Sequence, residues 1–476
     1  MLIRKAKSAV LWSGADIFLR QGLSLFVSIA LARLLSPEEF GTVALLFFFT
    51  GIASAFVDSG FSSALIQKQN ITHTDESTVF WFNLGMGLVV ASLLWAGAPA
   101  IAAFYGFPIL VSLTRVMAVN VIIQALSSVH STLLTKRLDF RTLMVIGTAS
   151  TIVSGMVAIG MAWWGYGIWA LAMQALSGTL VGTILFWILN PWRPAWIFSL
   201  DSARRLFAFG GYLLAAGLMD TAYNRGYTLL IGKFYGVSDL GYFSRADSAK
   251  QLPVAVLTGI LSRVAFPVFS AAAHDKVKLR RGVQLALRGM MLINVPTMLG
   301  LAAVAEPFVL TLFGEQWLPA VPILQVLCFA GIFWPLHVIN LNVLKAQGYS
   351  RLFFKLEIIK KVIGVILLIT GTLYGVMGVA WSLVISSGIA FVINAYYTGI
   401  HLNYGVRQQL RDFLPCFWIA LVMGAAVVSL NRGWQTSPAV ELVLTIVLGI
   451  ALFLSLGRIT RLSALRDSIT LFKQGQ

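Results

Sequence analysis

Residues 206–272 read LFAFGGYLLAAGLMDTAYNRGYTLLIGKFYGVSDLGYFSRADSAKQLPVAVLTGILSRVAFPVFSAA, and this stretch decides the fold. It is apolar enough for two membrane spans, yet it contains Asp220, Arg225, Arg245, Asp247, Lys250 and Arg263. A charge at the centre of a bilayer costs about 2.5–3.5 kcal/mol or more, so such side chains normally face a bundle interior or a wet cavity. The stretch therefore predicts two consecutive helices that line a polar cavity inside a membrane protein.

The composition of the whole chain supports this class. Of the 476 residues, 58% are hydrophobic and 11% are charged, whereas soluble domains carry about 25% charged residues. The net charge of +17 does not indicate nucleic-acid binding, because that function needs a basic face on a soluble domain. Cys328 and Cys416 are the only cysteines and lie in apolar runs, so the sequence predicts no disulfide framework, metal site or bound cofactor.

The N-terminal segment resembles a signal peptide in one respect, since Ala30-Leu31-Ala32 has the small-x-small form of a cleavage site. Its apolar part is about 27 residues long, however, and contains Asp16 and Arg20. Both its length and its charges are wrong for a signal peptide. We therefore expect an uncleaved first span.

The chain as a whole predicts an all-α polytopic membrane protein with about 14 transmembrane helices. Each expected span is long enough to cross about 30 Å of hydrocarbon as a helix, which satisfies its own backbone polar groups. Tight turns at 164–167 and 374–378 predict antiparallel neighbours. The expected spans are 8–34, 40–66, 78–104, 107–134, 142–164, 167–189, 206–232, 240–272, 283–313, 319–346, 353–374, 376–400, 411–431 and 436–457.

The distribution of Lys and Arg predicts the orientation. If the N-terminus is cytoplasmic, the tails and cytoplasmic loops hold 25 of the 35 basic residues, and the other side holds Arg33, Lys233 and Arg432. Cytoplasmic loops of membrane proteins carry this excess. We therefore expect both termini to be cytoplasmic.

An internal repeat divides the chain into two lobes. Arg33-Leu-Leu-Ser-Pro-Glu-Glu-Phe-Gly41 matches Lys233-Phe-Tyr-Gly-Val-Ser-Asp-Leu-Gly241 at an offset of 200 residues. We interpret the match as two parallel six-helix repeats, with chance similarity of apolar sequences as the alternative. The expected divisions are an N-lobe at 1–189, a linker at 190–205, a C-lobe at 206–400, and two further helices with a tail at 401–476.

Each lobe begins with an acid and a cation on its first span. Asp16 and Arg20 are four residues apart, and Asp220 and Arg225 are five apart. Either each pair neutralises itself in the lipid, or each lobe presents one cation to a central cavity. The excess of cations over acids at depth favours the second interpretation.

Further polar residues within the spans allow two interpretations each. Arg245 is close enough to a helix start to extend to the headgroups, whereas Lys250 and Arg263 lie deeper. Asp58 is either a helix cap or a carboxylate that takes up a proton, because burial raises a carboxyl pKa. His337 alone is better explained as a core residue than as a proton relay.

The chain resembles the polysaccharide exporter family of the multidrug/oligosaccharidyl-lipid/polysaccharide flippase superfamily, which includes O-antigen, teichuronic-acid and colanic-acid exporters. The resemblance extends over nearly the whole chain and implies two six-helix lobes in a V around a central cationic cavity. It also implies a lipid-diphosphate-linked oligosaccharide as substrate and an ion gradient as driver. The stretches that carry it are residues 35–41, 58–67, 240–246, 252–253 and 262–267.

The predicted function is a flippase that moves a polyprenyl-diphosphate-linked oligosaccharide from the inner to the outer leaflet of the bacterial cytoplasmic membrane by alternating access. The predicted partners are this lipid-linked oligosaccharide, membrane lipids, a polysaccharide polymerase and a chain-length regulator, without nucleic acid. The alternatives are a multidrug or cation antiporter of the same fold, which should show acidic excess at depth, and a membrane polymerase or ligase, which needs a large outer loop with catalytic groups. The expected coupling is to a proton or sodium gradient, through Asp220, Asp58 or Asp16. The residues expected to bind the diphosphate are Arg20, Arg225, Arg245, Lys250 and Arg263.

Overall fold

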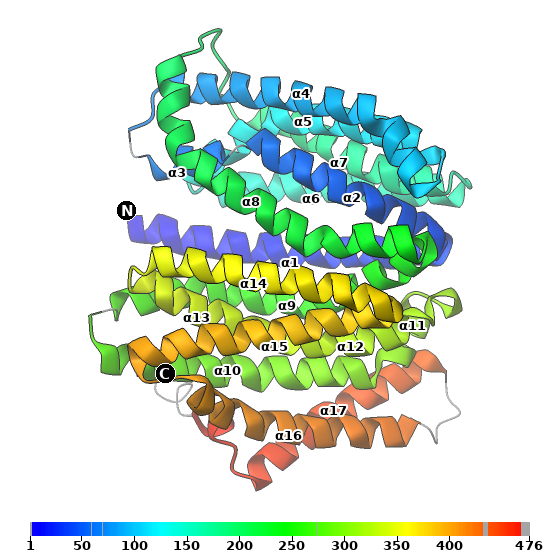
Figure 1. The fold of residues 1–476 in the computed structure, drawn as a ribbon, viewed down its shortest axis with the longest axis vertical. Helices are drawn as coiled ribbons and strands as arrows, with labels where there is room; N and C mark the ends of the chain where they lie inside the picture. Colours follow the sequence, from blue (N-terminus) through cyan, green and yellow to red (C-terminus); the bar gives the residue numbers. More distant parts are fainter. Residues whose placement is uncertain (1, 59, 69, 273, 432–436, 468–476) are drawn as a thin grey trace. The chain divides into compact units, whose positions relative to one another are not determined.

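The computed structural model describes residues 2–58, 60–68, 70–272, 274–431 and 437–467, with the backbone alone described at 2–13, 15–18, 209, 260–268, 270–271, 350 and 431. Helices account for the secondary structure of these residues, without a strand among them. They form two compact units, Met1–Gly241 and Tyr242–Gln476. Figure 1 shows the helices of each unit running side by side.

The first unit is built from eight helices and the beginning of a ninth. Within it, α4 packs on α5, α6 on α7, α1 on α6, and α2 on α8. Its helices are α1 (Leu2–Leu34), α2 (Pro37–Asp58), α3 (Phe61–Gln67), α4 (His73–Tyr105), α5 (Ile109–Lys136), α6 (Phe140–Trp163), α7 (Ile168–Leu189), α8 (Leu200–Phe234) and the first residues of α9 (Val237–Ala271).

The second unit contains the rest of α9 and eight further α-helices. Within it, α10 packs on α16, α14 on α15, and α17 on α16 and α11. Its further helices are α10 (Lys276–Ala303), α11 (Ala305–Leu312), α12 (Ala320–Ile332), α13 (Trp334–Ala346), α14 (Ser350–Gly371), α15 (Gly375–Leu402), α16 (Val406–Asn431) and α17 (Pro438–Ile459), with short 3-10 turns at Glu315–Trp317 and Thr372–Tyr374.

Each expected span coincides with one helix or with two consecutive helices. The expected span 40–66 is broken at Gly60, whose φ of 71° is a conformation that favours glycine. The expected spans 283–313 and 319–346 are likewise divided, at Val304 and Phe333. The break at Phe333 precedes Pro335, whose ring is tolerated at a helix start but not in the interior of a helix.

The count of 14 membrane spans is not confirmed. Among the described residues, ten helical stretches are long and apolar enough to cross a membrane, or eleven if a bent pair in α8 is counted as one span. One of the ten, Arg351–Leu402, has 52 residues and comprises both α14 and α15. The bent pair, Leu200–Ala208 and Gly210–Phe234, meets at 54°.

The two tight turns are confirmed as connections between packed neighbours. Gly165 and Gly167 have φ of 80° and 55° between α6 and α7, and Gly375 has φ of 79° at the start of α15. Without a Cβ, glycine adopts such angles at no steric cost. Both pairs, α6 with α7 and α14 with α15, pack against each other.

The expected linker is held against α4 rather than extended. Trp81 Nε1 donates to the carbonyl of Ala195 at 2.8 Å, and the backbone N–H of Ser199 donates to Thr78 Oγ1 at 3.1 Å. Beyond it, α8 packs against α2, α3 and α4 in the first unit, although the repeat assigns α8 to the second lobe. The lobe boundaries stay a prediction.

Side chains accept hydrogen bonds from the backbone N–H groups in the first turns of α4 and α10. Thr72 and Asp75 form a capping box at α4, and Asp275 accepts the backbone N–H groups of Val277 and Lys278, at 3.0 Å each, at α10. Such bonds satisfy donors that a helix leaves unpaired at its first turn. The Lys278 N–H is the main cause that holds the pKa of the Asp275 carboxyl below its usual range.

Candidate functional site

Two of the residues predicted to bind the diphosphate, Arg20 and Arg225, pack against glycines of neighbouring helices in the first unit. The Cδ and Cζ atoms of Arg20 on α1 would lie 2.7 and 3.1 Å from a Cβ on Gly147 of α6. Arg225 on α8 packs over Gly51 of α2 in the same way, with Cδ and Nε at 3.5 Å from such a Cβ. Both arginines are exposed on this unit, and the missing side chains of the glycines leave room for their stems.

Arg225 also makes an aromatic contact. Its guanidinium carbon lies 5.9 Å from the ring centre of Phe47 on α2, within the range of a cation–π interaction. Asp220, one and a half turns earlier on α8, is exposed as well. The predicted cation and the predicted coupling carboxylate are therefore both exposed side chains of α8.

Asp58 ends α2 at the break before Gly60. Its Oδ1 accepts a short hydrogen bond from Ser62 Oγ on α3, and Ser62 Oγ in turn accepts one from Thr132 Oγ1 on α5 at 2.8 Å. The carboxylate is half-buried and connects the two helices on either side of the break. This bond joins two side chains and does not cap a helix, since the N-cap of α3 is Gly60 without a side-chain cap bond. Both interpretations of Asp58 therefore stay predictions.

Arg245 on α9 is enclosed by aromatic rings of the second unit. Its guanidinium carbon lies 5.1 Å from the ring centre of Phe313 and 5.2 Å from that of Trp317, and the residue is 5% exposed. The rings stabilise the charge in place of water. A diphosphate would have to displace them to reach Arg245.

Lys250, one turn further along α9, has an acidic partner. Its Nζ lies 2.5 Å from Asp247 Oδ1, and its stem packs on α12, with Cγ at 3.4 Å from a Cβ built on Gly331. The lysine is 9% exposed. The side chains of Asp16 and Arg263 lie outside the described residues.

The structure thus places Asp220 and Arg225 on α8, and Arg245 and Lys250 on α9. Arg20 lies on α1 and Asp58 at the end of α2. The described residues include no group of three or more His, Cys, Asp or Glu that could hold a metal ion. Substrate binding by these side chains stays a prediction.

In the second unit, the sequence analysis named His337 but missed the pair of Glu357 and Lys360. Lys360 Nζ lies 2.5 Å from Glu357 Oε1 on α14, and His337 Nδ1 on α13 lies 3.4 Å from Asn394 Nδ2 on α15. The spacing of Glu357 and Lys360 by three residues on a helix is the signal that identifies the pair.

An ion-pair network around Arg288 was missed as well. Arg288 on α10 contacts Asp412 on α16 at 2.6 Å and Asp467, beyond α17, at 2.7 Å. Tyr404 Oη and Gln284 Nε2 each donate to Asp412 Oδ2 at 2.8 Å. Because its acidic partners lie 124 and 179 residues away in the chain, spacing alone carries no signal for this network.

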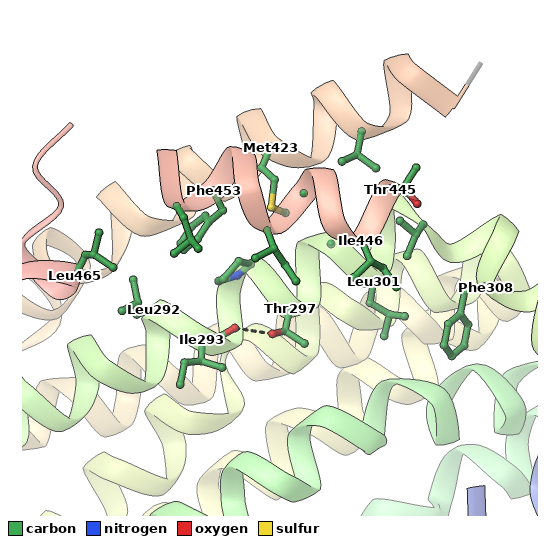
Figure 2. A pocket seen from close by; sticks show the side chains of 17 residues that line it. Leu292, Ile293, Thr297, Leu301, Phe308, Met423, Thr445, Ile446, Phe453 and Leu465 are labelled. Atoms are coloured by element: carbon green, nitrogen blue, oxygen red, sulfur yellow. Dashed lines mark hydrogen bonds between the residues drawn. The ribbon is translucent and has the colours of Figure 1, made fainter. Parts of the chain in front are cut away.

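An apolar pocket of about 490 Å³ lies between α10, α11, α16 and α17 (Figure 2). Its walls include Leu301, Met423 and Phe453. The hydroxyls of Thr297 and Thr445 donate to carbonyls of their own helices, at 2.7 and 2.6 Å. They therefore leave the lining without a free polar group, which suits a hydrocarbon chain.

The fold is similar to that of known transporters. The structure of lipid II flippase MurJ in an inward closed conformation matches with a TM-score of 0.78 over 97% of this chain and 100% of that chain, at 16% identity. An inward-facing multidrug resistance transporter of the MATE family matches with a TM-score of 0.64 over 80% of this chain and 94% of that chain, at 18% identity. These similarities confirm the all-helical transporter fold.

Sequence relatives identify the family. The teichuronic acid biosynthesis protein TuaB of Bacillus subtilis is 31% identical over 79% of this chain and 78% of its own. The lipopolysaccharide biosynthesis protein WzxC of Escherichia coli is 27% identical over 86–88% of both chains. The family model described as polysaccharide biosynthesis protein matches residues 30–322. The chain therefore belongs to this family of polysaccharide biosynthesis proteins.

Proposed function

We propose that this multi-pass membrane protein moves a polyprenyl-diphosphate-linked oligosaccharide from the inner to the outer leaflet of the bacterial cytoplasmic membrane. Membership of the polysaccharide biosynthesis family is the observation that carries the proposal. Relatives named for teichuronic acid, succinoglycan transport and lipopolysaccharide support it. Because these names describe transport and biosynthesis of glycans, we propose a transporter rather than an enzyme.

The cations at depth suit a diphosphate headgroup. Arginine binds phosphate oxygens through two parallel N–H donors, and both Arg225 and Arg20 are exposed on the first unit. They are therefore the best candidates among the predicted residues. Lys250 would first have to leave Asp247, and Arg245 would have to leave its aromatic rings.

The apolar pocket of the second unit suits the other end of the substrate. Its hydrocarbon lining offers nothing to a sugar or phosphate and favours an isoprenoid or acyl chain. We propose that the tail stays in contact with apolar surface of this kind while the headgroup crosses. The remaining proposed partners are a polysaccharide polymerase and a chain-length regulator, which would use the product at the outer leaflet.

The proposed source of energy is an ion gradient rather than a bound nucleotide. The proposed coupling groups are Asp220, Asp58 and Asp16, of which Asp220 is exposed on α8 five residues before Arg225. A proton on Asp220 would strengthen the net positive field near Arg225, and its release would weaken the hold on the diphosphate. The proposed topology places both termini in the cytoplasm.

The direct test uses the purified protein in phospholipid vesicles that carry a fluorescent polyprenyl-diphosphate oligosaccharide. A membrane-impermeant quencher reports the fraction of substrate in the outer leaflet, with and without a proton or sodium gradient. We expect a protein-dependent redistribution of the labelled glycan lipid. A protein that leaves this lipid in place but moves a cationic dye would instead be a drug antiporter.

A further inference from the structure

The two copies of the repeat contact each other at equivalent positions. A Cβ on Gly41 would lie well under 3.0 Å from the carbonyl oxygen of Val237, and one on Gly241 would lie equally close to the carbonyl oxygen of Pro37. Gly41 and Gly241 are 200 residues apart, and so are Pro37 and Val237. All four residues belong to the first unit.

This contact is reciprocal. Each copy presents its glycine to the same carbonyl of the other copy, which is the pattern of a two-fold, self-complementary interface. The carbonyl carbons of Val237 and Pro37 would lie 2.6 and 2.8 Å from the two built Cβ atoms. Real Cβ atoms essentially never approach backbone so closely, so the contact accepts glycine alone.

The helix start on one side of the contact is rigid. At α2, the backbone N–H and Oγ of Ser36 donate to Glu39 Oε2 at 2.7 and 3.0 Å, and the Glu39 N–H donates to Ser36 Oγ at 3.3 Å. This capping box fixes the first turn of α2. A clash at Gly41 therefore has to separate the helices, because fraying of the α2 start cannot relieve it.

The contact between Gly41 on α2 and Gly241 on α9 lies at one end of a row of close contacts between α2 and α8, called the seam below. Going away from Gly41, Gly232 of α8 packs on Leu45, Thr221 packs on Gly51, and Gly60 packs on Gly210. The partners run in opposite directions along the chain, so the helices are antiparallel. At the far end, the break in the expected second span meets the bend in α8.

We propose that Gly41 and Gly241 form a clasp that closes one end of the α2–α8 seam, and that the clasp opens and re-forms in each transport cycle. A clasp of backbone against backbone leaves no space for a headgroup or water while it is closed. The closure is a property of the fold, and only its role in a cycle rests on the proposed function.

The test measures access to the seam. Thr221, whose methyl group would lie 3.2 Å from a Cβ on Gly51, is replaced (Thr221→Cys) in a chain with Cys328→Ala and Cys416→Ala. A membrane-impermeant maleimide is then added to one side of sealed vesicles at a time. Gly41→Ala and Gly241→Ala should each raise the labelling rate about tenfold or more, the change expected when a two-state equilibrium moves to its open form.

The matched control is Gly217→Ala on the same helix α8, where a Cβ would have nothing within 4 Å. It should leave labelling unchanged. Labelling of both alanine variants at the unsubstituted rate would overturn the clasp. If labelling rises but wild-type vesicles move no glycan lipid, the clasp stands and the proposed function fails.

A second measurement covers the case in which both variants fail to fold. In the protein with Gly41 and Gly241 intact, labelling of Thr221→Cys should rise during transport, when glycan lipid and the gradient are both present. Constant labelling under conditions in which the glycan lipid moves would show that the clasp stays closed throughout the cycle. That outcome would overturn the proposal as well.

Discussion

Arg288 contacts Asp412 through two nitrogens, with Nη2 at 2.6 Å and Nε at 3.0 Å from the same carboxylate oxygen. The third guanidinium nitrogen, Nη1, donates to Asp467 at 2.7 Å. One side chain of α10 therefore holds both α16 and the segment after α17 within the second unit. The same segment supplies Leu465 to the wall of the apolar pocket.

We expect Arg288→Ala to destabilise the second unit by about 2–4 kcal/mol, because it leaves the largely buried Asp412 without its cation. Arg288→Lys should recover part of this, since an ammonium group cannot contact both acids in the fork geometry of a guanidinium. Thermal unfolding in detergent measures the change. Lys278→Ala, which breaks an exposed pair with Asp275, is the control and should leave the unfolding temperature unchanged.

Arg225→Ala should reduce export by about 10–100-fold, because a charge-assisted hydrogen bond to the diphosphate contributes about 1.5–3 kcal/mol. Arg225→Lys should retain part of the activity, since the charge remains. Complementation of a strain that lacks its own exporter measures the effect, with protein quantified in the membrane fraction. Normal export by Arg225→Ala would show that this residue does not bind the diphosphate.

For Lys250 the ion pair with Asp247 allows a sharper experiment. If Lys250 binds the diphosphate, Lys250→Ala should abolish export, and the added change Asp247→Asn should not restore it. If Lys250 serves only to neutralise Asp247, the double variant should fold and export normally, because no unpaired charge remains. Export assays on the single and the double variant decide between these roles.

Asp220→Asn should make transport insensitive to pH or sodium, because the amide can neither bind nor release the coupling ion. Asp58→Asn is the matched comparison, since Asp58 has a hydroxyl partner in Ser62 and should act mainly on the helix break. The measurement is the ion dependence of glycan-lipid movement in vesicles. Unchanged dependence in Asp220→Asn would make this carboxylate structural and direct attention to Asp58 or Asp16.

The orientation is tested by reporter fusions along the chain. Fusions after Arg141, Lys278 and Arg407 should report a cytoplasmic location, and one after Gly433, which lies outside the described residues, an external one. These sites follow from the distribution of basic residues. An external signal at Lys278 would contradict the two-lobe topology.

The sequence by itself determined the class, the helices and the family. Apolar runs of about 20 or more residues have one stable form in a membrane, the helix, because it satisfies every backbone polar group internally. For this reason the expected spans agree with α1 to α17 to within several residues at each end. The repeat at 33–41 and 233–241 was also visible, since equal positions in two copies of one unit keep similar residues.

Only the tertiary structure decided what each polar residue contacts. Lys250 forms an ion pair with Asp247 on its own helix. Arg245, in contrast, lies against the rings of Phe313 and Trp317. Arg288 binds acids on two distant segments. It likewise showed that Gly41 and Gly241, known from the sequence as equivalent, touch each other through their backbones. Periodicity is a local property of the chain, whereas contacts between helices depend on how their surfaces pack, and that packing involves residues hundreds of positions apart.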